Sequence, residues 1–533
     1  MNRRCGYPGR PRVLPGMNDH PSIPRRAESF WGPVLGDGTP DHLGERHEVI
    51  VVGAGIIGLS TALVLAERGV DVAVIEARRP GAGTTTRSTA KVTLQQSTML
   101  GKITATHGPQ VARAYLTANR HGQDLVRRVI DGADVDHDVR DAWTYTIAEQ
   151  GVGAIHQEHA ALAEQGLPAT LSVPEELPFP TRAAVRLPGQ LQINPSQYVA
   201  ALEGRLTELG VPVAWPTRVA GVMDSGDELH VVTTGGLTVS ARWVVLATLL
   251  PFPRRTLVFA NSSPSRSYVM ACRGPRTMPE GMYISADSPT RSLRTARSAA
   301  GEQYLLVGGN GHPTGKKNPT HQHVDDLARW AHANFQVSEF THRWSAQDYS
   351  SVDLLPQIGR APLGPSGLLM ATGMGKWGMT NGSAAGLILA DIITGQEKPW
   401  AAALKPRLAG SIPGLGKFAR LNAEVGVKLL KGWAVEPRLT PDSESQEGRG
   451  AVRRHVPAPQ AVSTSRGRRR VCSAVCTHLG GIVAWNDADQ SWDCPLHGSV
   501  FSPDGAVLEG PAVQAIASES PPETVLSDEV GQG

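Results

Sequence analysis

The sequence predicts an α/β fold of the Rossmann-like, doubly wound type, followed by a small metal-binding unit near the C-terminus. Two observations carry this prediction. Between Glu48 and Glu76 an apolar β-branched stretch leads through three regularly spaced glycines into a helical pattern and then a second strand. Near the C-terminus, two short segments that each hold one cysteine and one histidine lie fifteen residues apart. The 533 residues suffice for roughly two to four domains.

Composition excludes several classes of protein. With 40% hydrophobic and 19% charged residues, the chain is not wholly disordered. A formal net charge of +3 gives no reason to expect nucleic acid as a partner. Five cysteines are too few, and an odd number, for a disulfide scaffold, so we expect a reducing compartment and a cytoplasmic protein.

The ends of the chain and the segment before the metal-binding unit show little pattern. Residues 1–45 are rich in Pro, Gly and Arg and lack a signal-peptide core, so we expect a mostly disordered extension, with Met17 as a candidate start. Residues 399–470 are expected to hold a helical segment and then a linker, because Pro, Ser and charged residues dominate from 436 onward. The acidic tail 517–533 is expected to be disordered.

The first motif is a dinucleotide-binding fingerprint. Gly53, Gly55 and Gly58 follow a strand pattern and open a helix, an arrangement that permits a tight turn, a close approach to a pyrophosphate and close helix–strand packing. Glu76 ends the second strand, where its carboxylate can accept hydrogen bonds from ribose hydroxyls. The uncharged run 49–66 is long enough for a membrane span, but this motif favours a buried strand–turn–helix, so no transmembrane segment is expected. The motif alone does not separate FAD from NAD.

Further segments follow the fingerprint in a recognisable order. Thr84–Lys91 follows the second strand, and Gln192–Pro195 precedes a helical pattern. Ile358–Arg360 and the Gly-rich stretch Ala371–Gly382 come next. Together these segments resemble the glycine/D-amino-acid oxidase (DAO) family of FAD-dependent oxidoreductases over about residues 46–398, a resemblance that favours FAD over NAD.

The resemblance implies an FAD-binding domain (about 46–100, 190–250 and 345–398) interleaved with an α+β substrate domain (about 101–189 and 251–344). Sarcosine-oxidase relatives attach FAD through a cysteine near the closing segment, and 358–398 contains none, so we expect non-covalent FAD. The expected cofactor-binding residues are Gly53, Gly55, Ile56, Ile57, Gly58, Glu76, Ala77, Thr89, Ala90, Lys91, Gly373, Gly375, Lys376, Trp377, Gly378, Met379 and Thr380.

The sequence does not identify a catalytic acid or base. Lys91, Lys376 and Trp377 are candidates for positions next to the flavin, and a lysine there can stabilise reduced, anionic flavin; a solvated lysine and a packing tryptophan are the alternatives. Four histidines in the regions expected to bind substrate are more typical of surface or packing positions: His107, His121, His312 and His342.

The second motif is the pair of mixed loops, Cys476-Thr-His478 and Cys494-Pro-Leu-His497. A zinc finger usually groups cysteine with cysteine, whereas a Rieske [2Fe–2S] centre takes two thiolates on one iron and two imidazoles on the other. The longer strings 476–481 and 494–499, with Gly510-Pro511, resemble the Rieske family. The resemblance implies a small all-β domain with its core at 471–516 and Cys476, His478, Cys494 and His497 as cluster ligands. Zinc is the alternative metal.

Departures from that family indicate the cluster's properties. Gly481 and Leu496 stand where high-potential Rieske proteins have a disulfide, and Phe501 stands where they place a Tyr donor. Ser499 is kept and can donate a hydrogen bond to a cluster sulfur. Fewer donors predict a potential in the lower half of the Rieske range of about −150 to +300 mV. Cys472 lies outside the pattern and is expected to be a buried apolar thiol.

The resemblance implies a dehydrogenase that oxidises an amine or amino-acid-like small molecule by hydride transfer to FAD and passes electrons through the Rieske cluster to an acceptor, for example a redox protein or a quinone. One alternative is an FAD oxidase that uses O2, with the Rieske domain as a docking or redox-sensing module. Another is a zinc-bound interaction module on a catalytically idle flavoprotein. A ring-hydroxylating oxygenase is disfavoured because no mononuclear iron motif follows the loops.

Overall fold

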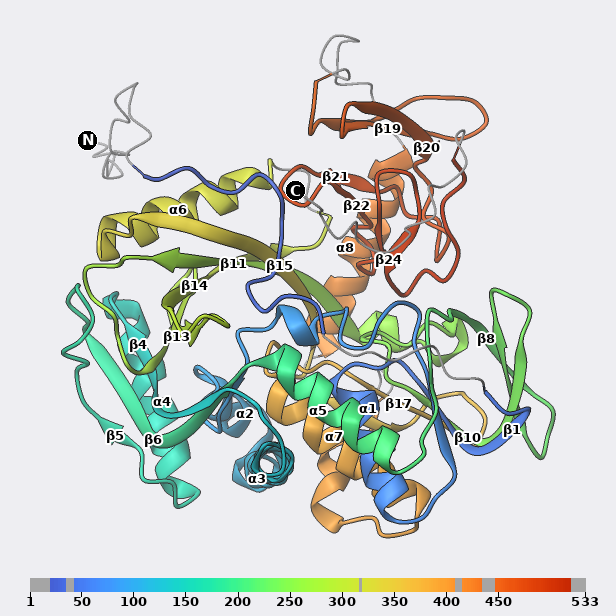
Figure 1. Ribbon diagram of the computed structural model, residues 1–533, viewed down its shortest axis with the longest axis horizontal. Helices are drawn as coiled ribbons and strands as arrows, with labels where there is room; N and C mark the ends of the chain where they lie inside the picture. The colour runs from blue at the N-terminus through green and yellow to red at the C-terminus, as the bar shows by residue number, and fades with distance from the viewer. Residues whose placement is uncertain (1–19, 35–42, 316–318, 408–414, 434–445, 519–533) are drawn as a thin grey trace, which may run out of the picture.

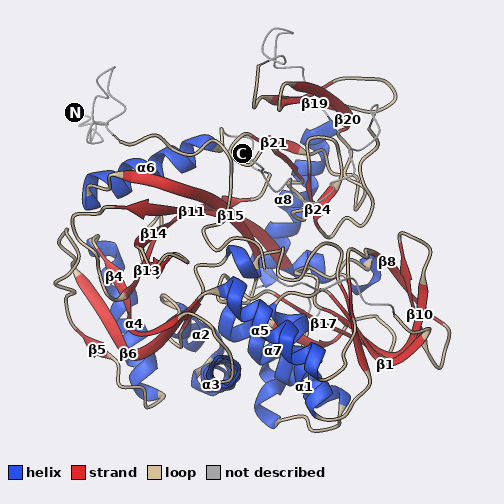
Figure 2. Ribbon diagram, viewed as in Figure 1, coloured by secondary structure: helices blue, strands red, loops and turns tan. Residues whose placement is uncertain are grey.

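The computed structural model describes residues 20–34, 43–315, 319–407, 415–433 and 446–518 (Figure 1). The expected start at Met17, the residues 434–445 and the tail beyond Ser518 lie outside these described residues. Two large sheets form the body of the molecule, and two small antiparallel sheets form a C-terminal unit that lies against it (Figures 1 and 2). Among the described residues, no helix has the length and apolar character that crossing a lipid bilayer requires.

The first large sheet is the Rossmann-like one. Its strands run in the order β16-β17-β10-β1-β2-β7, and β1 lies parallel to both β2 and β10. Alternate residues of β1 face opposite sides: Val49 and Val51 pack toward the helices, whereas Ile50 and Val52 pack toward β8 and β9. The elements of this part are β1 (Arg46–Val52), α1 (Ile56–Glu67), β2 (Val72–Ile75), α5 (Pro195–Glu208), β7 (Val213–Ala214), β8 (Val219–Asp224), β9 (Leu229–Thr233), β10 (Thr238–Leu246), β16 (Gln357–Arg360), β17 (Leu368–Thr372) and α7 (Gly378–Ile393).

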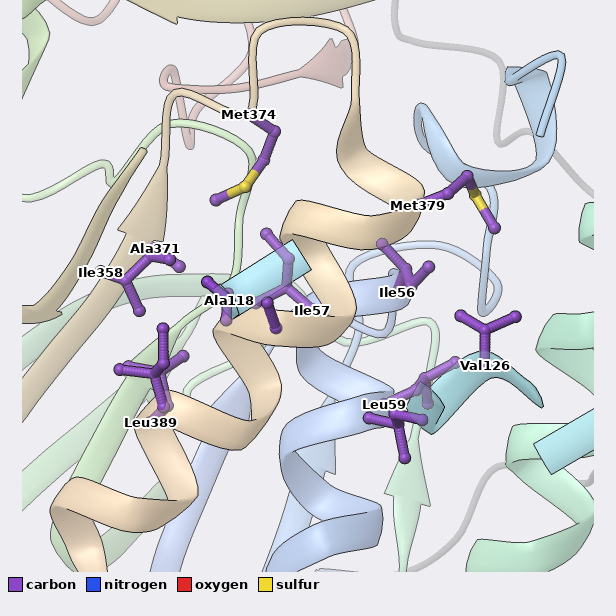
Figure 3. Packing of buried hydrophobic residues seen from close by; sticks show 14 of the residues in the cluster. Ile56, Ile57, Leu59, Ala118, Val126, Ile358, Ala371, Met374, Met379 and Leu389 are labelled. Carbon is purple, nitrogen blue, oxygen red and sulfur yellow. The ribbon is translucent and has the colours of Figure 1, made fainter. Parts of the chain in front are cut away.

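Small residues bring the helices of this layer close together, and Figure 3 shows the apolar side chains that pack around them. A Cβ atom on Gly386 of α7 would lie 2.6 Å from Ser60 Cβ of α1, and one on Gly122 would lie 2.1 Å from the Thr380 carbonyl oxygen. Ile56 and Leu59 of α1, with Leu389 of α7, fill the apolar interior of this layer. Close packing of α1 and α7 fixes the two helix N-termini that border the site described below.

The second large sheet is interleaved with the first along the chain. It has the order β15-β11-β14-β13-β12-β4-β6-β3, with β5 beside β6, and is mostly antiparallel. The elements are β3 (Lys91–Val92), α2 (Met99–His107), α3 (Pro109–Asp131), β4 (His137–Thr146), α4 (Val152–Glu164), β5 (Thr170–Leu171), β6 (Ala183–Ile193), β11 (Ser262–Arg273), β12 (Met282–Ser285), β13 (Arg291–Arg297), β14 (Gln303–Pro313), α6 (His321–Phe335) and β15 (Glu339–Ser351).

The C-terminal unit contains more strand than expected. The segment 436–470 was predicted to be a linker, but its described part enters a three-stranded antiparallel sheet. Arg466 and Gly467 have φ values of 54° and 69° and form the two-residue turn of a hairpin, so the basic run there is a turn and a strand. The elements are α8 (Leu415–Trp433), β18 (Gly450–Arg453), β19 (Gln460–Ser465), β20 (Arg468–Ser473), β21 (Ala484–Asn486), β22 (Ser491–Asp493), β23 (Val500–Phe501) and β24 (Val507–Glu509).

The N-terminal extension is also more ordered than expected. Residues 20–34 lie against the second large sheet, where Glu28 forms a bridge with Arg343. Trp31 is buried, and its Nε1 donates a hydrogen bond to the Ser88 carbonyl oxygen at 2.8 Å. The prediction of disorder was wrong for this stretch because one buried aromatic anchor offsets a polar, Pro-rich composition.

Candidate functional site

A cavity of about 580 Å³ lies at the carboxyl ends of β1, β2 and β10. The fingerprint glycines and Glu76 border one part of it, and the loop between β17 and α7 borders another. This is the place where parallel sheets of this type bind their ligands. The cavity therefore joins the two chain segments, more than 250 residues apart, that the sequence assigns to the cofactor.

The fingerprint has the geometry that a dinucleotide requires. Gly53 has a φ of +109°, and a Cβ atom there would lie 2.6 Å from the Ala247 carbonyl oxygen. A Cβ atom on Gly58 would lie 1.8 Å from the Gly53 carbonyl oxygen, so this glycine serves the close packing of helix on strand. The Glu76 carboxylate accepts hydrogen bonds from the backbone N–H groups of Ala54 (2.8 Å) and Arg78 (2.9 Å), which hold it at the cavity edge.

The loop that closes the cavity is held by a buried carboxylate. Asp348 of β15 accepts hydrogen bonds from the backbone N–H groups of Lys376 and Tyr349, and burial raises the pKa of Asp348 to about 6. Lys376 has a left-handed backbone conformation, with φ of 72°, and its Nζ donates to Ser267 Oγ at 2.8 Å. Asp348 thus fixes the backbone of a residue that borders the cavity.

Lys91 lies in the wall between the two large sheets. Its Nζ donates hydrogen bonds to the Tyr283 carbonyl oxygen (2.6 Å) and to Ser292 Oγ (2.8 Å). Burial, with a smaller contribution from the nearby Arg294 guanidinium, lowers the pKa of Lys91 well below its usual value. Lys91 is therefore a fixed, buried amine at the cavity and not a solvated surface cation.

Most of the predicted cofactor residues border this one cavity. Four do not: Gly58 packs on the Gly53 carbonyl, Gly373 packs on the Ser351 side chain, Ala90 is fully buried, and Thr380 accepts a hydrogen bond from Gln96 Nε2. The predicted residues that border the cavity are Gly53, Gly55, Ile56, Ile57, Glu76, Ala77, Thr89, Lys91, Gly375, Lys376, Trp377, Gly378 and Met379. Residues that sequence reasoning missed include Arg78, Arg87, Thr217, Arg218, Tyr268, Asp348 and Leu508–Val513.

The four histidines considered earlier are dispersed. His121 stacks on Trp400 with 5.4 Å between ring centroids, and His107 Nε2 contacts the Asp353 carbonyl oxygen. His312 is buried, and its Nε2 lies 3.0 Å from the hydroxyl of Tyr268, which borders the cavity. Within the part of the chain that the structure describes, His312 is the one of these four histidines that is hydrogen-bonded to the cavity wall.

The four predicted metal ligands lie together at the tips of two similar turns. In the first turn Cys476 N–H donates to the Gly481 carbonyl oxygen at 2.8 Å, and in the second Cys494 N–H donates to that of Ser499 at 2.8 Å. The first turn connects β20 to β21, and the second connects β22 to β23. Each turn therefore presents one thiol and one imidazole, and all four side chains are buried: Cys476, His478, Cys494 and His497.

The chemistry of this donor set fits a metal cluster. Nε2 of His478 and Nδ1 of His497 are buried and have no hydrogen-bond partner among the described residues. Burial lowers the pKa of His478 to about 3 and that of His497 to about 4, so both imidazoles are neutral, as ligation requires. The hydrogen bond between the two thiols lowers the pKa of Cys476 to about 7 and, together with burial, raises the pKa of Cys494 above its usual value, so without a metal one thiol of the pair ionises more readily than the other.

The departures from the high-potential pattern are visible around these ligands. A Cβ atom on Gly481 would lie 2.7 Å from Leu496 Cγ, so these two positions do face each other. Ser499 is fully buried, and its hydroxyl is hydrogen-bonded to Cys476 and accepts from Ala512 N–H at 3.0 Å. Phe501 is buried without a hydroxyl. Cys472 is buried as predicted.

The two histidines predicted to be ligands, His478 and His497, face the flavoprotein body and not solvent. Phe259, in the short 3₁₀ helix η4 (Val258–Asn261), lies edge-on to both rings, with centroids 4.8 Å from His497 and 5.7 Å from His478. The two histidine rings are themselves 5.3 Å apart and nearly perpendicular. The ligand edge of the metal site is therefore covered by a side chain of the larger body.

Three consecutive residues of β15 connect the metal site with the cavity. Tyr349 Oη donates to the His497 carbonyl oxygen at 2.7 Å, and Gln347 Nε2 donates to that of Gly498 at 2.7 Å. Asp348, between them, faces the opposite way and borders the cavity. One strand thus holds the second ligand loop on one side and the closing loop of the cavity on the other.

Comparison with known proteins identifies a family for the larger body and another for the C-terminal unit. The DAO family model, described as "FAD dependent oxidoreductase", matches residues 48–392, and that of the Rieske [2Fe-2S] domain matches residues 438–520. The Bacillus subtilis (strain 168) protein YhfW, named for a Rieske 2Fe-2S iron-sulfur centre, is 33% identical over 472 residues, which cover 88% of this chain and 92% of YhfW.

Solved structures share the fold of the larger body. Glycine oxidase from Geobacillus kaustophilus has a TM-score of 0.58 at 21% identity, over 68% of this chain and 99% of its own. L-proline dehydrogenase from P. horikoshii has a TM-score of 0.56 at 20% identity, over 68% of this chain and 100% of its own. With a family model that covers most of its length, this chain belongs to the DAO family of FAD-dependent oxidoreductases and carries a C-terminal Rieske [2Fe-2S] domain.

Proposed function

We propose that the protein is a dehydrogenase of an amine or amino-acid-like small molecule, in which electrons pass from FAD through the Rieske cluster to a one-electron acceptor, either a redox protein or a quinone. The bound groups supply the redox chemistry: FAD accepts a hydride equivalent, and the cluster accepts single electrons. The low cysteine count favours the cytoplasm as its compartment.

One observation carries this proposal: the Rieske domain borders the FAD cavity directly. Residues Leu508–Val513 line the cavity together with Gly53 and Gly55. Strand β15 borders the cavity through Asp348 and contacts His497 through Tyr349. A docking or sensing module would have no need to reach the cofactor cavity. Contact between the two sites supports electron transfer within the molecule.

The polar wall of the cavity supports a small polar substrate. Lys91, Ser292 and Tyr268 line the part formed by the second large sheet, and Lys376 faces Ser267 across it. The amino groups of two lysines that border one cavity supply hydrogen-bond donors, which favour a substrate with acceptor oxygens, such as a carboxylate-bearing molecule. The glycine oxidase and L-proline dehydrogenase named above act on amino acids by their names, which agrees with this substrate class. We propose non-covalent FAD, because none of the lining residues is a cysteine.

Anaerobic screening of the purified holoprotein tests the function. Amines, amino acids and 2-hydroxy acids are added in turn, and bleaching of the flavin absorbance identifies the substrate. We expect the same addition to produce the electron paramagnetic resonance (EPR) signal of a reduced Rieske cluster, with an average g below two.

A Cys476→Ser variant separates the proposal from its alternatives. If this variant still releases one peroxide per substrate at the wild-type rate in air, the protein is an oxidase and the relay is wrong. Zinc in place of iron on metal analysis of the wild-type protein would make the C-terminal domain an interaction module.

A further inference from the structure

A segment of the Rieske domain forms part of the FAD cavity. Leu508, Glu509 and Gly510 line it, as do Pro511, Ala512 and Val513. This segment begins at the end of β24 and continues into the loop after it. It faces residues of the first large sheet region, including Gly53, Arg87 and Arg218. The cofactor cavity is therefore lined by residues of two domains, the flavoprotein body and the Rieske domain.

The segment is attached to the flavoprotein by polar contacts at the cavity edge. Arg218 Nη2 donates a hydrogen bond to the Val507 carbonyl oxygen at 3.0 Å. Arg87 Nη1 lies 3.5 Å from Glu509 Oε1, and Glu509 is almost fully buried. Because Arg87 and Arg218 also line the cavity, these contacts set the position of the segment relative to the cofactor.

The same segment is attached to both turns that hold the cluster ligands. Ala512 N–H donates to Ser499 Oγ at 3.0 Å, and Ser499 follows the second ligand turn. Thr477, between the ligands Cys476 and His478, donates from its hydroxyl to the Gln514 carbonyl oxygen at 2.6 Å. A change in the ligand turns is thereby transmitted to the cavity wall.

Glu509 places in this wall a carboxylate oxygen that can accept a further hydrogen bond. Its side chain is 6% exposed, and Oε2 has no hydrogen-bond partner among the described residues. A buried carboxylate oxygen without a donor is costly, and the cavity that Glu509 borders is where a donor can arrive. FAD carries such donors in its ribityl and ribose hydroxyls and in its flavin N–H.

We propose that the FAD site is built by both domains, with Glu509 of the Rieske domain as a hydrogen-bond acceptor for FAD, and that FAD binding and cluster binding are consequently coupled. Linkage makes the coupling reciprocal: the cluster strengthens FAD binding by the factor by which FAD strengthens cluster binding. The proposal is independent of the substrate and of the direction of electron flow.

The first experiment tests Glu509 itself. The full chain with Glu509→Gln keeps the size of the side chain but weakens the acceptor, and we expect the Kd for FAD, measured by the change in flavin fluorescence, to rise about tenfold, which corresponds to about 1.4 kcal/mol. Glu447→Gln is the matched control, because Glu447 is exposed in the same domain and contacts the backbone of Arg466 and Gly467. An unchanged or lower Kd for the Glu509 variant would overturn its assigned role.

The second experiment tests the coupling. The Kd for FAD is compared between cluster-loaded protein and protein from which a chelator has removed the iron, and the rate of iron loss is compared between FAD-loaded and FAD-free protein. We expect FAD to bind roughly 5- to 100-fold more weakly without the cluster, and iron to leave faster without FAD. Equal FAD affinity with and without the cluster overturns the coupling.

A third experiment uses a variant that retains the cluster, because removing the iron can also unfold the protein and weaken FAD binding for that reason alone. Thr477→Val removes the hydroxyl contact to Gln514 and leaves all four ligands in place. With the EPR signal of the cluster intact, we expect this variant to show weaker FAD binding than wild type. A wild-type Kd in this variant would show that the attachment through Thr477 does not transmit the coupling and would contradict the proposed route.

Discussion

At the scale of single residues, Tyr349 joins the Rieske domain to the flavoprotein. Its buried hydroxyl donates to the carbonyl oxygen of the ligand His497. Tyr349→Phe leaves that carbonyl buried without its donor, so we expect the free energy of unfolding to fall by about 1–3 kcal/mol in thermal or urea denaturation. Tyr304→Phe is the control, because Tyr304 contacts the exposed Arg273 and Glu302. Equal losses in the two variants would contradict a special role for Tyr349.

The hydroxyl of Ser499 is hydrogen-bonded to Cys476, one of the predicted cluster ligands. Hydrogen bonds to cluster sulfurs stabilise the reduced state. Ser499→Ala is therefore expected to lower the midpoint potential in a redox titration followed by EPR. Ser502→Ala, in the turn between β23 and β24, removes a hydroxyl that contacts Asp504 and Ala506, and we expect it to leave the potential unchanged. A potential that rises in Ser499→Ala would refute this reading.

At the scale of elements, helix α4 carries a buried carboxyl against α2. Glu158 accepts a hydrogen bond from Gly101 N–H at 2.7 Å, and burial raises its pKa to about 8. The folded state thus holds a proton that the unfolded chain releases near pH 4.5, so stability declines as pH rises between these two values. We expect a loss on the order of 1–3 kcal/mol between pH 5 and pH 8. Glu158→Gln should flatten the profile of Tm against pH, and an unchanged slope would rule this cause out.

Strand β11 holds the Rieske domain through one buried cation. Arg266 Nη1 lies 3.0 Å from Asp489 and its Nε lies 3.4 Å from Asp493, both in the Rieske domain. Arg266→Met leaves two carboxylates without their counter-ion, and we expect a cost of about 3–5 kcal/mol, with faster proteolysis between the domains. Arg273→Met, at the exposed end of the same strand, should cost far less, because solvent screens its ion pairs with Glu302 and Glu339. A similar, small effect of both variants would show that Arg266 does not hold the domain.

Some elements were predictable because their signals are local. The spacing of Gly53, Gly55 and Gly58 and the mixed Cys/His loops each specify a geometry within a few residues. The strand Gln460–Ser465 was not, because its sequence QAVSTS is mostly polar and resembles a loop, although every residue of it is buried. Asp348 and Glu509 have no local signature either, since their roles arise only when β15 and β24 meet the cavity.

At the scale of the whole molecule, polar contacts hold the Rieske domain against the flavoprotein body. Three parts of the flavoprotein body contact it through hydrogen bonds or ion pairs: Arg254, which lies shortly before η4, and the strands β11 and β15. We therefore expect the proposed electron transfer from FAD to the cluster to need no domain rotation. We expect its rate, followed by stopped-flow absorbance, to stay within about twofold as glycerol raises the viscosity, because a domain motion would slow with the solvent. A rate that falls in proportion to viscosity would show that the domain moves.

The alternation of side chains along β15 has a consequence for how such proteins can diverge. Gln347 and Tyr349 serve the ligand loop, and Asp348 serves the cavity. Inserting or deleting one residue within this strand would exchange the two faces and deprive both redox sites of their partners at once. Relatives that keep both cofactors should therefore align across β15 without gaps.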